Sequence, residues 1–84
     1  MRILIVGFGA IGQRHFNNLI QRTDCEVAIC RRSLQSAQQT HERFGVEAFA
    51  NLQASIAWHP DCVIICNPTS LHVNTAQWAI DQGY

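Results

Sequence analysis

Three glycines near the start of the chain have the spacing of a phosphate-binding turn. The segment Gly7–Gly12 reads G-F-G-A-I-G, and the apolar run Ile3–Val6 comes directly before it. A buried strand that passes through G-x-G-x-x-G into a helix is the fingerprint of a dinucleotide-binding turn. The chemistry is the holding of a pyrophosphate by main-chain N–H groups, to which the helix N-terminus adds a positive dipole.

Each of the three glycines has a separate task in such a turn. Gly7 allows the tight bend out of the strand, where a side chain would force an unfavourable backbone angle. Gly9 lets the main chain come close to a pyrophosphate, and Gly12 lets the helix pack closely on the strand. The segment therefore predicts a turn that binds a nucleotide.

The elements that position this turn alternate along the chain, which predicts an α/β fold with a parallel sheet. We expect strands over Arg2–Val6, Glu26–Cys30, Val46–Ala50 and Asp61–Cys66, and helices over Ile11–Arg22, Ser33–Phe44, Asn51–Trp58 and from Pro68 to Gly83. Right-handed crossovers give the strand order 3-2-1-4, a Rossmann-like doubly wound sheet. Tyr84 is expected to begin a fifth strand, so the predicted sheet is truncated before that strand.

Apolar periodicity predicts which side of each helix faces the sheet. The expected core-facing stripes are Ile11, Phe16, Leu19 and Ile20 on the first helix, Leu34, Ala37, His41 and Phe44 on the second, and Leu71, Val73, Ala76 and Ile80 on the last. Ser33 and Asn51 are of the N-cap type, and Gly45 and Gly83 occupy C-cap positions.

The end of the second predicted strand indicates which dinucleotide would bind. An NAD site carries an acidic residue about 20 residues after the glycines, where it bonds the ribose 2′-hydroxyl. This chain has Arg31, Arg32 and Ser33 there instead. Charge-assisted hydrogen bonds from these groups to a 2′-phosphate would each contribute about 1.5–3 kcal/mol. The sequence thus predicts NADP(H) in preference to NAD(H), with solvated surface charges as the alternative reading of the two arginines.

Composition excludes several other classes of function. Six basic residues balance six acidic ones among the 84 residues, so nothing indicates a nucleic-acid partner or an anionic membrane surface. No apolar run approaches the roughly 18 residues of a membrane span. The first strand begins within three residues of Met1, which leaves no room for a signal peptide and predicts a cytoplasmic protein. Residues 1–84 are expected to form one incomplete dinucleotide-binding domain.

The four cysteines, Cys25, Cys30, Cys62 and Cys66, match no metal-binding spacing. Cys62 and Cys66 share one face of a predicted strand about 13 Å apart, too far for a disulfide or a shared metal ion. We expect all four to be small buried hydrophobes, and we predict no metal site.

Two ordered motifs make the chain resemble the N-terminal part of the Gfo/Idh/MocA family of NAD(P)-dependent oxidoreductases. The first is Gly7–His15, in which a histidine follows the last glycine by three places. The second is Pro60–His72, an apolar strand followed by a Pro-Thr-x-x-His loop. The resemblance covers essentially the whole chain.

That resemblance implies an oxidoreductase acting on a hydroxyl of a sugar, cyclitol or nucleotide-sugar. It implies that Gly9, Ala10 and Ile11 hold the pyrophosphate. It also implies that the loop with Asn67, Pro68, Thr69 and His72 lies beside the pyrophosphate and the nicotinamide ribose. His72 is expected to orient that loop or contact the ribose rather than transfer a proton, and His15 to cap or pack.

The chain departs from the family pattern where catalysis would be expected. Family enzymes carry a Glu-Lys-Pro motif after the fifth strand and a second domain with further catalytic groups, and neither occurs in these 84 residues. We therefore assign no catalytic residue, and expect a cofactor-binding portion that is inactive alone.

Two other interpretations remain open: a stand-alone, non-catalytic nucleotide-binding or redox-sensing module, and a degenerate remnant that neither folds nor binds. The strand Asp61–Cys66 would be an uncovered apolar edge, which predicts self-association. Because Cys62–Cys66 contains no charge or proline to blunt that edge, the sequence favours a truncated enzyme over an independent module.

Overall fold

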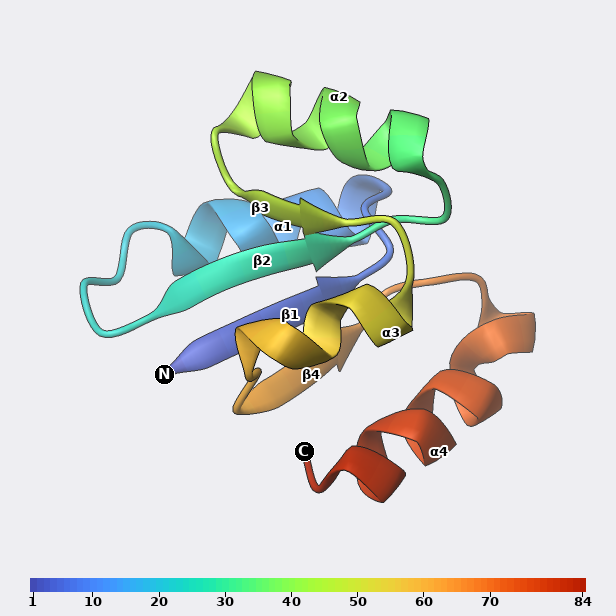
Figure 1. The fold of residues 1–84 in the computed structure, drawn as a ribbon. Helices are drawn as coiled ribbons and strands as arrows, with labels where there is room; N and C mark the ends of the chain where they lie inside the picture. The colour runs from blue at the N-terminus through green and yellow to red at the C-terminus, as the bar shows by residue number, and fades with distance from the viewer.

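The computed structural model describes residues 1–84 and is built on a four-stranded parallel sheet (Figure 1). The strands are β1 (Arg2–Val6), β2 (Glu26–Cys30), β3 (Glu47–Phe49) and β4 (Cys62–Ile65), in the order β3-β2-β1-β4. The predicted order is confirmed. Val6 lies opposite Cys30 on one side and Ile65 on the other, so the central strands end at the same level.

Helices cover both faces of the sheet, as a doubly wound fold requires. The helical elements are α1 (Ala10–Leu19), α2 (Leu34–Phe44), α3 (Leu52–Ser55), η1 (Ile56–Trp58), η2 (Thr69–Leu71) and α4 (His72–Gln82). Figure 1 shows α1 and α2 on one side of the sheet, with α3 and α4 on the other. None of these helices has the length and apolar character that a membrane-spanning helix requires.

Alternate strand residues form two separate cores. Leu4, Val6, Ala28 and Cys30 face the side of α3 and α4, where Trp58 and Trp78 pack on them. On the other side, Ile5 and Ile29 pack with Phe8 and Phe16. The rings of Phe8, Phe16 and Phe44 meet edge to face at centroid distances of 4.9–5.7 Å. These rings tie the loop after β1 to both α1 and α2.

The predicted helix caps are confirmed. The Ser33 Oγ accepts the N–H of Ser36 at the start of α2, and the Asn51 Oδ1 accepts the N–H of Ala54 in α3. Gly45 and Gly83 end α2 and α4 in the left-handed conformation, with φ of 67° and 82°. Local hydrogen-bonding chemistry alone fixes these boundaries, which is why the sequence reveals them.

The predicted apolar stripes are wrong at several positions. Six of their members are exposed: Ile11, Ile20, Leu34, His41, Val73 and Ile80. The buried stripes are instead made of small residues, Ala37 with Thr40 on α2 and Thr75 with Ala79 on α4. These small residues are spaced by three or four positions, which fits the helical period as well as the predicted stripes do. Small side chains also let a helix lie close to the sheet.

Some predicted boundaries also differ. The strands β3 and β4 are each one residue shorter at both ends than expected, and α1 ends at Leu19 rather than Arg22. Tyr84 is the last residue that the structure describes, so the fifth strand expected to begin there stays a prediction. The N–H of Tyr84 donates to the carbonyl oxygen of Ala79 at 3.0 Å, and the centre of its ring lies 5.5 Å from that of Trp78.

Candidate functional site

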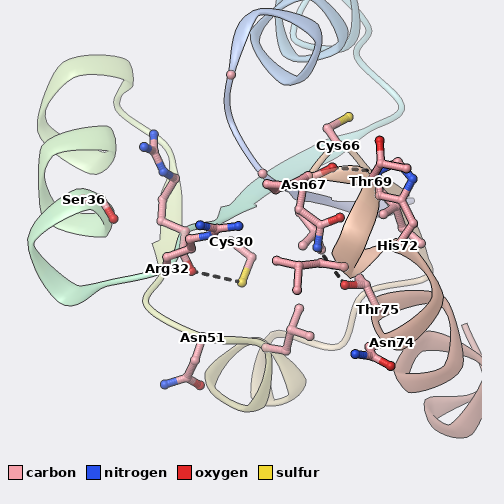
Figure 2. Close-up of a pocket in the computed structure, with 18 of the residues that line it drawn as sticks. Cys30, Arg32, Ser36, Asn51, Cys66, Asn67, Thr69, His72, Asn74 and Thr75 are labelled. Carbon is pink, nitrogen blue, oxygen red and sulfur yellow. Dashed lines mark hydrogen bonds between the residues drawn. The ribbon is translucent and has the colours of Figure 1, made fainter.

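A cavity of about 990 Å³ opens at the carboxyl ends of β1, β2 and β4. In Figure 2, Arg32, Ser36 and Asn51 lie on one side of it, with Asn67, Thr69 and His72 on the other. Nine of the predicted site residues line it: Gly7, Gly9, Ile11, Arg31, Arg32, Asn67, Pro68, Thr69 and His72. Ala10, Gly12 and Ser33 do not. The cavity thus joins the glycine turn to the loop after β4.

The glycine turn is packed on one side and open on the other. Gly7 has φ of 93°, and a Cβ there would lie 2.6–2.7 Å from backbone atoms of Cys66 and Asn67. A Cβ on Gly12 would overlap the carbonyl oxygen of Gly7. A Cβ on Gly9 would meet nothing within 4 Å. Because Gly9 lines the cavity, its missing side chain leaves room for a ligand against the main chain.

The N-terminus of α1 has no side-chain cap and no nearby carboxylate. Gly9 is its N-cap and supplies no side-chain hydrogen bond, and the first turn contains no acidic residue. The first N–H groups of a helix have no acceptor within the helix. Together with the helix dipole, they form a site for an anion such as a pyrophosphate. The residues present therefore fit the dinucleotide that the turn predicts.

The loop after β4 is held by side chains from its own end of α4. The Asn67 Nδ2 donates to Thr75 Oγ1 at 2.7 Å, and the His72 Nε2 lies 2.6 Å from the Asn67 carbonyl oxygen. The Asn67 Oδ1 is buried without a hydrogen-bond partner. These two hydrogen bonds link the loop to α4, and Thr69 is exposed at the cavity.

The two arginines after β2 are placed differently. Arg31 is half-buried, its Nη1 donates to the Thr40 Oγ1 at 3.2 Å, and its guanidinium lies 5.9 Å from the centre of the Phe8 ring. Arg32 is exposed. The Ser33 hydroxyl is engaged in the cap of α2, and Ser36 lines the cavity in its place.

Sequence reasoning missed several residues of the cavity wall: Ser36, Ala50, Asn51, Leu52, Asn74 and Thr75. Thr75 follows His72 by three residues, so a helix beginning near His72 would have placed both on one face. The sequence predicts Asn51 only as a helix cap. Its position depends on the path of the chain after β3, which no local pattern specifies.

All four cysteines are free thiols. Cys30 is buried as expected, but the other three are only half-buried, so the expectation that all four are buried is wrong. Burial raises the pKa of the Cys30 thiol to about 11, and burial also raises the pKa values of Cys62 and Cys66. No group of three or more His, Cys, Asp or Glu side chains could hold a metal ion. Cys30 therefore lines the cavity as a neutral thiol at ordinary pH.

The raised pKa of Cys30 predicts a loss of stability in alkali. The unfolded thiol ionises near its ordinary pKa of about 8.5, whereas the folded thiol stays protonated up to about 11. The folded state therefore binds more protons in this window, and the free energy of unfolding falls as pH rises through it. Urea unfolding at pH 8 and pH 10 measures this fall, which should be smaller in Cys30→Ala than in the control Cys25→Ala. Equal falls in the two variants would contradict it.

The fold and the cavity define the class of protein: a doubly wound parallel α/β domain with a dinucleotide site at its switch point. The family described as "Oxidoreductase family, NAD-binding Rossmann fold" matches the whole chain, residues 1–84. The chain belongs to this family, the Gfo/Idh/MocA oxidoreductases.

Known relatives agree with that assignment. The 4-carboxy-2-hydroxymuconate-6-semialdehyde dehydrogenase of Sphingobium sp. is 30% identical over 86 residues, covering 99% of this chain and 27% of that protein. The WlbA dehydrogenase from Chromobacterium violaceum, solved in complex with NADH and UDP-GlcNAcA, has a TM-score of 0.84 and 28% identity, covering 100% of this chain and 25% of that one.

A probable dehydrogenase from Thermotoga maritima shares the fold, with a TM-score of 0.76 and 24% identity, covering 98% of this chain and 25% of that one. The chain thus spans about a quarter of the length of the relatives it matches. The description of the family to which the chain belongs names an NAD-binding Rossmann fold, which agrees with a nicotinamide dinucleotide at this site.

Proposed function

We propose that these residues are the cofactor-binding portion of an oxidoreductase that uses NADP(H) in preference to NAD(H). The observation that carries the proposal is the cavity itself, which brings the open glycine turn, the loop after β4 and two arginines to one place. When bound, the nicotinamide supplies hydride transfer. The chain's own residues bind and orient it.

Different parts of the cavity are proposed to hold different parts of the dinucleotide. Main-chain groups of Gly9, Ala10 and Ile11, at the start of α1, hold the pyrophosphate. The loop of Asn67, Pro68, Thr69 and His72 lies at the nicotinamide ribose, where the exposed Thr69 hydroxyl can hydrogen-bond. The hydrogen bond between His72 and the Asn67 carbonyl supports an orienting role for that histidine.

The preference for NADP(H) rests on the positive charge of the two arginines after β2, where the ribose 2′-phosphate would lie. Arg31 and Arg32 both line the cavity, and Arg31–Ser33 contains no carboxylate to bond a ribose 2′-hydroxyl. A 2′-phosphate brought there would form charge-assisted hydrogen bonds to a guanidinium.

Fluorescence titration with NADPH and NADH tests this preference. We expect NADPH to bind at least about tenfold more tightly, the factor that one charge-assisted bond supplies. Replacement of both arginines by alanine should remove the difference and leave NADH affinity unchanged. An unchanged ratio between the two affinities in that double variant contradicts the proposed preference.

For the whole enzyme we propose a substrate hydroxyl on a sugar, cyclitol or nucleotide-sugar. The presence of UDP-GlcNAcA in the complex of the WlbA dehydrogenase supports this class. We further propose that these 84 residues alone bind cofactor without turnover, since they span only a quarter of the relatives' length. The cytoplasmic location and self-association through β4, an edge strand of the sheet, also remain predictions.

A further inference from the structure

The buried face of α2 contains one polar residue, Thr40. Thr40 is only 3% exposed, and its neighbour on that face is Ala37. Its hydroxyl donates its single proton to the Ser36 carbonyl oxygen at 2.9 Å. The oxygen lone pairs are therefore left to accept, and Arg31 Nη1 donates to them at 3.2 Å.

The same guanidinium makes a second contact, with Phe8. The Arg31 guanidinium carbon lies 5.9 Å from the centre of the Phe8 ring, within the range of a cation–π interaction. Phe8 belongs to the glycine turn and is itself only 5% exposed. Arg31 is thus fixed between the phosphate-binding turn and α2, while Arg32 is exposed and has no such tether.

Fixing this side chain does not use up its hydrogen-bonding capacity. A guanidinium has five N–H donors, and Thr40 accepts from one of its nitrogens. Arg31 remains half-buried at the cavity wall, so other donors are free for a ligand. An arginine held in place before binding loses less rotamer entropy when it binds an anion than a free one does.

We propose that Arg31 is the residue that binds the ribose 2′-phosphate, and that Thr40 positions the Arg31 side chain for this contact. The inference rests on the proposed NADP(H) preference and adds which arginine acts and what holds it. Arg32 is then a solvated surface charge.

The test compares the binding of 2′,5′-ADP and 5′-AMP by calorimetry, since these probes differ only in the 2′-phosphate. We expect Thr40→Val to weaken 2′,5′-ADP about three- to tenfold, the cost of ordering one arginine side chain again at each binding event. Affinity for 5′-AMP should stay within about twofold, and Thr40→Ser, which keeps the acceptor, should restore selectivity. Arg31→Ala should lose about tenfold or more in 2′,5′-ADP affinity, and Arg32→Ala much less.

A matched control removes the same kind of bond elsewhere. The Ser55 Oγ donates to the Leu52 carbonyl oxygen at 2.6 Å, and the residue is fully buried outside the cavity lining. Ser55→Ala should therefore lower stability without changing selectivity. A second measurement needs no ligand. The NMR order parameter of the Arg31 Nε–H bond should fall in Thr40→Val and stay unchanged in Ser55→Ala.

The outcomes separate this inference from the proposed function. Selectivity retained in Thr40→Val, but lost in Arg31→Ala, would overturn the positioning role and leave the NADP(H) preference standing. Loss in Arg32→Ala alone would overturn the choice of arginine. Equal binding of both probes by the unaltered protein would overturn the preference and this inference with it.

Discussion

Replacing Gly7 with alanine is expected to lower the free energy of unfolding by about 2–5 kcal/mol, more than any other substitution proposed for this chain. Two costs combine there. The residue has φ of 93°, which an L-residue adopts only with strain, and its Cβ would lie 2.6–2.7 Å from backbone atoms of Cys66 and Asn67. Those atoms belong to the chain as it leaves β4 and have no side-chain freedom with which to move aside.

Thermal unfolding followed by circular dichroism measures this effect, at about 4–8 °C for each kcal/mol in a domain of this size. Gly45→Ala is the matched control. Gly45 has φ of 67°, but a Cβ added there would meet nothing within 4 Å, so this variant carries the backbone strain without the collision. If Gly7→Ala loses no more stability than Gly45→Ala, the close approach of the turn to β4 is wrong.

Replacing Gly9 with alanine is expected to have the opposite profile, a large loss of binding with little loss of stability. Gly9 has φ of −77°, which any residue adopts, and a Cβ there meets nothing within 4 Å. The added methyl group instead occupies the cavity where the pyrophosphate would meet the main chain. Steric overlap of this kind costs about 1–3 kcal/mol, so NADPH affinity should fall about five- to 150-fold.

Titration with NADPH checks this expectation, with Gly45→Ala again as the control, because Gly45 lies outside the cavity lining. Stability should change by no more than about 1 kcal/mol, the cost of alanine at an N-cap position. Undiminished NADPH affinity in Gly9→Ala would mean that the ligand does not touch the turn at this glycine.

The sequence predicted the sheet well because the relevant signals are local or general. Ile3–Val6 is apolar without interruption, as a strand covered on both faces must be, and the right-handed crossover rule then orders the strands. Ser33 and Gly45 mark the ends of α2 by hydrogen bonds and backbone angles that involve only near neighbours. These features require no knowledge of packing.

The orientation of the helices and the state of the arginines could not be predicted in this way. On α4, the stripe of Val73 and Ile80 and the stripe of Thr75 and Ala79 fit the same helical period. Large apolar residues were expected inside, but the small pair faces the core. The hydrogen bond between Arg31 and Thr40 depends in turn on how α2 is rotated. The sequence alone therefore does not indicate which of the two arginines is held in place.

The most direct test of the central claim is an NMR titration of the 84-residue chain with NADPH, observed through backbone amide shifts. We expect the largest changes in the N–H groups of Gly9, Ala10, Ile11 and Gly12, at the open end of α1, with further changes in the loop Asn67–His72. Those two segments meet at one cavity in the structure. Shifts confined to other parts of the sheet, or none at NADPH concentrations that saturate the fluorescence signal, would contradict the claim.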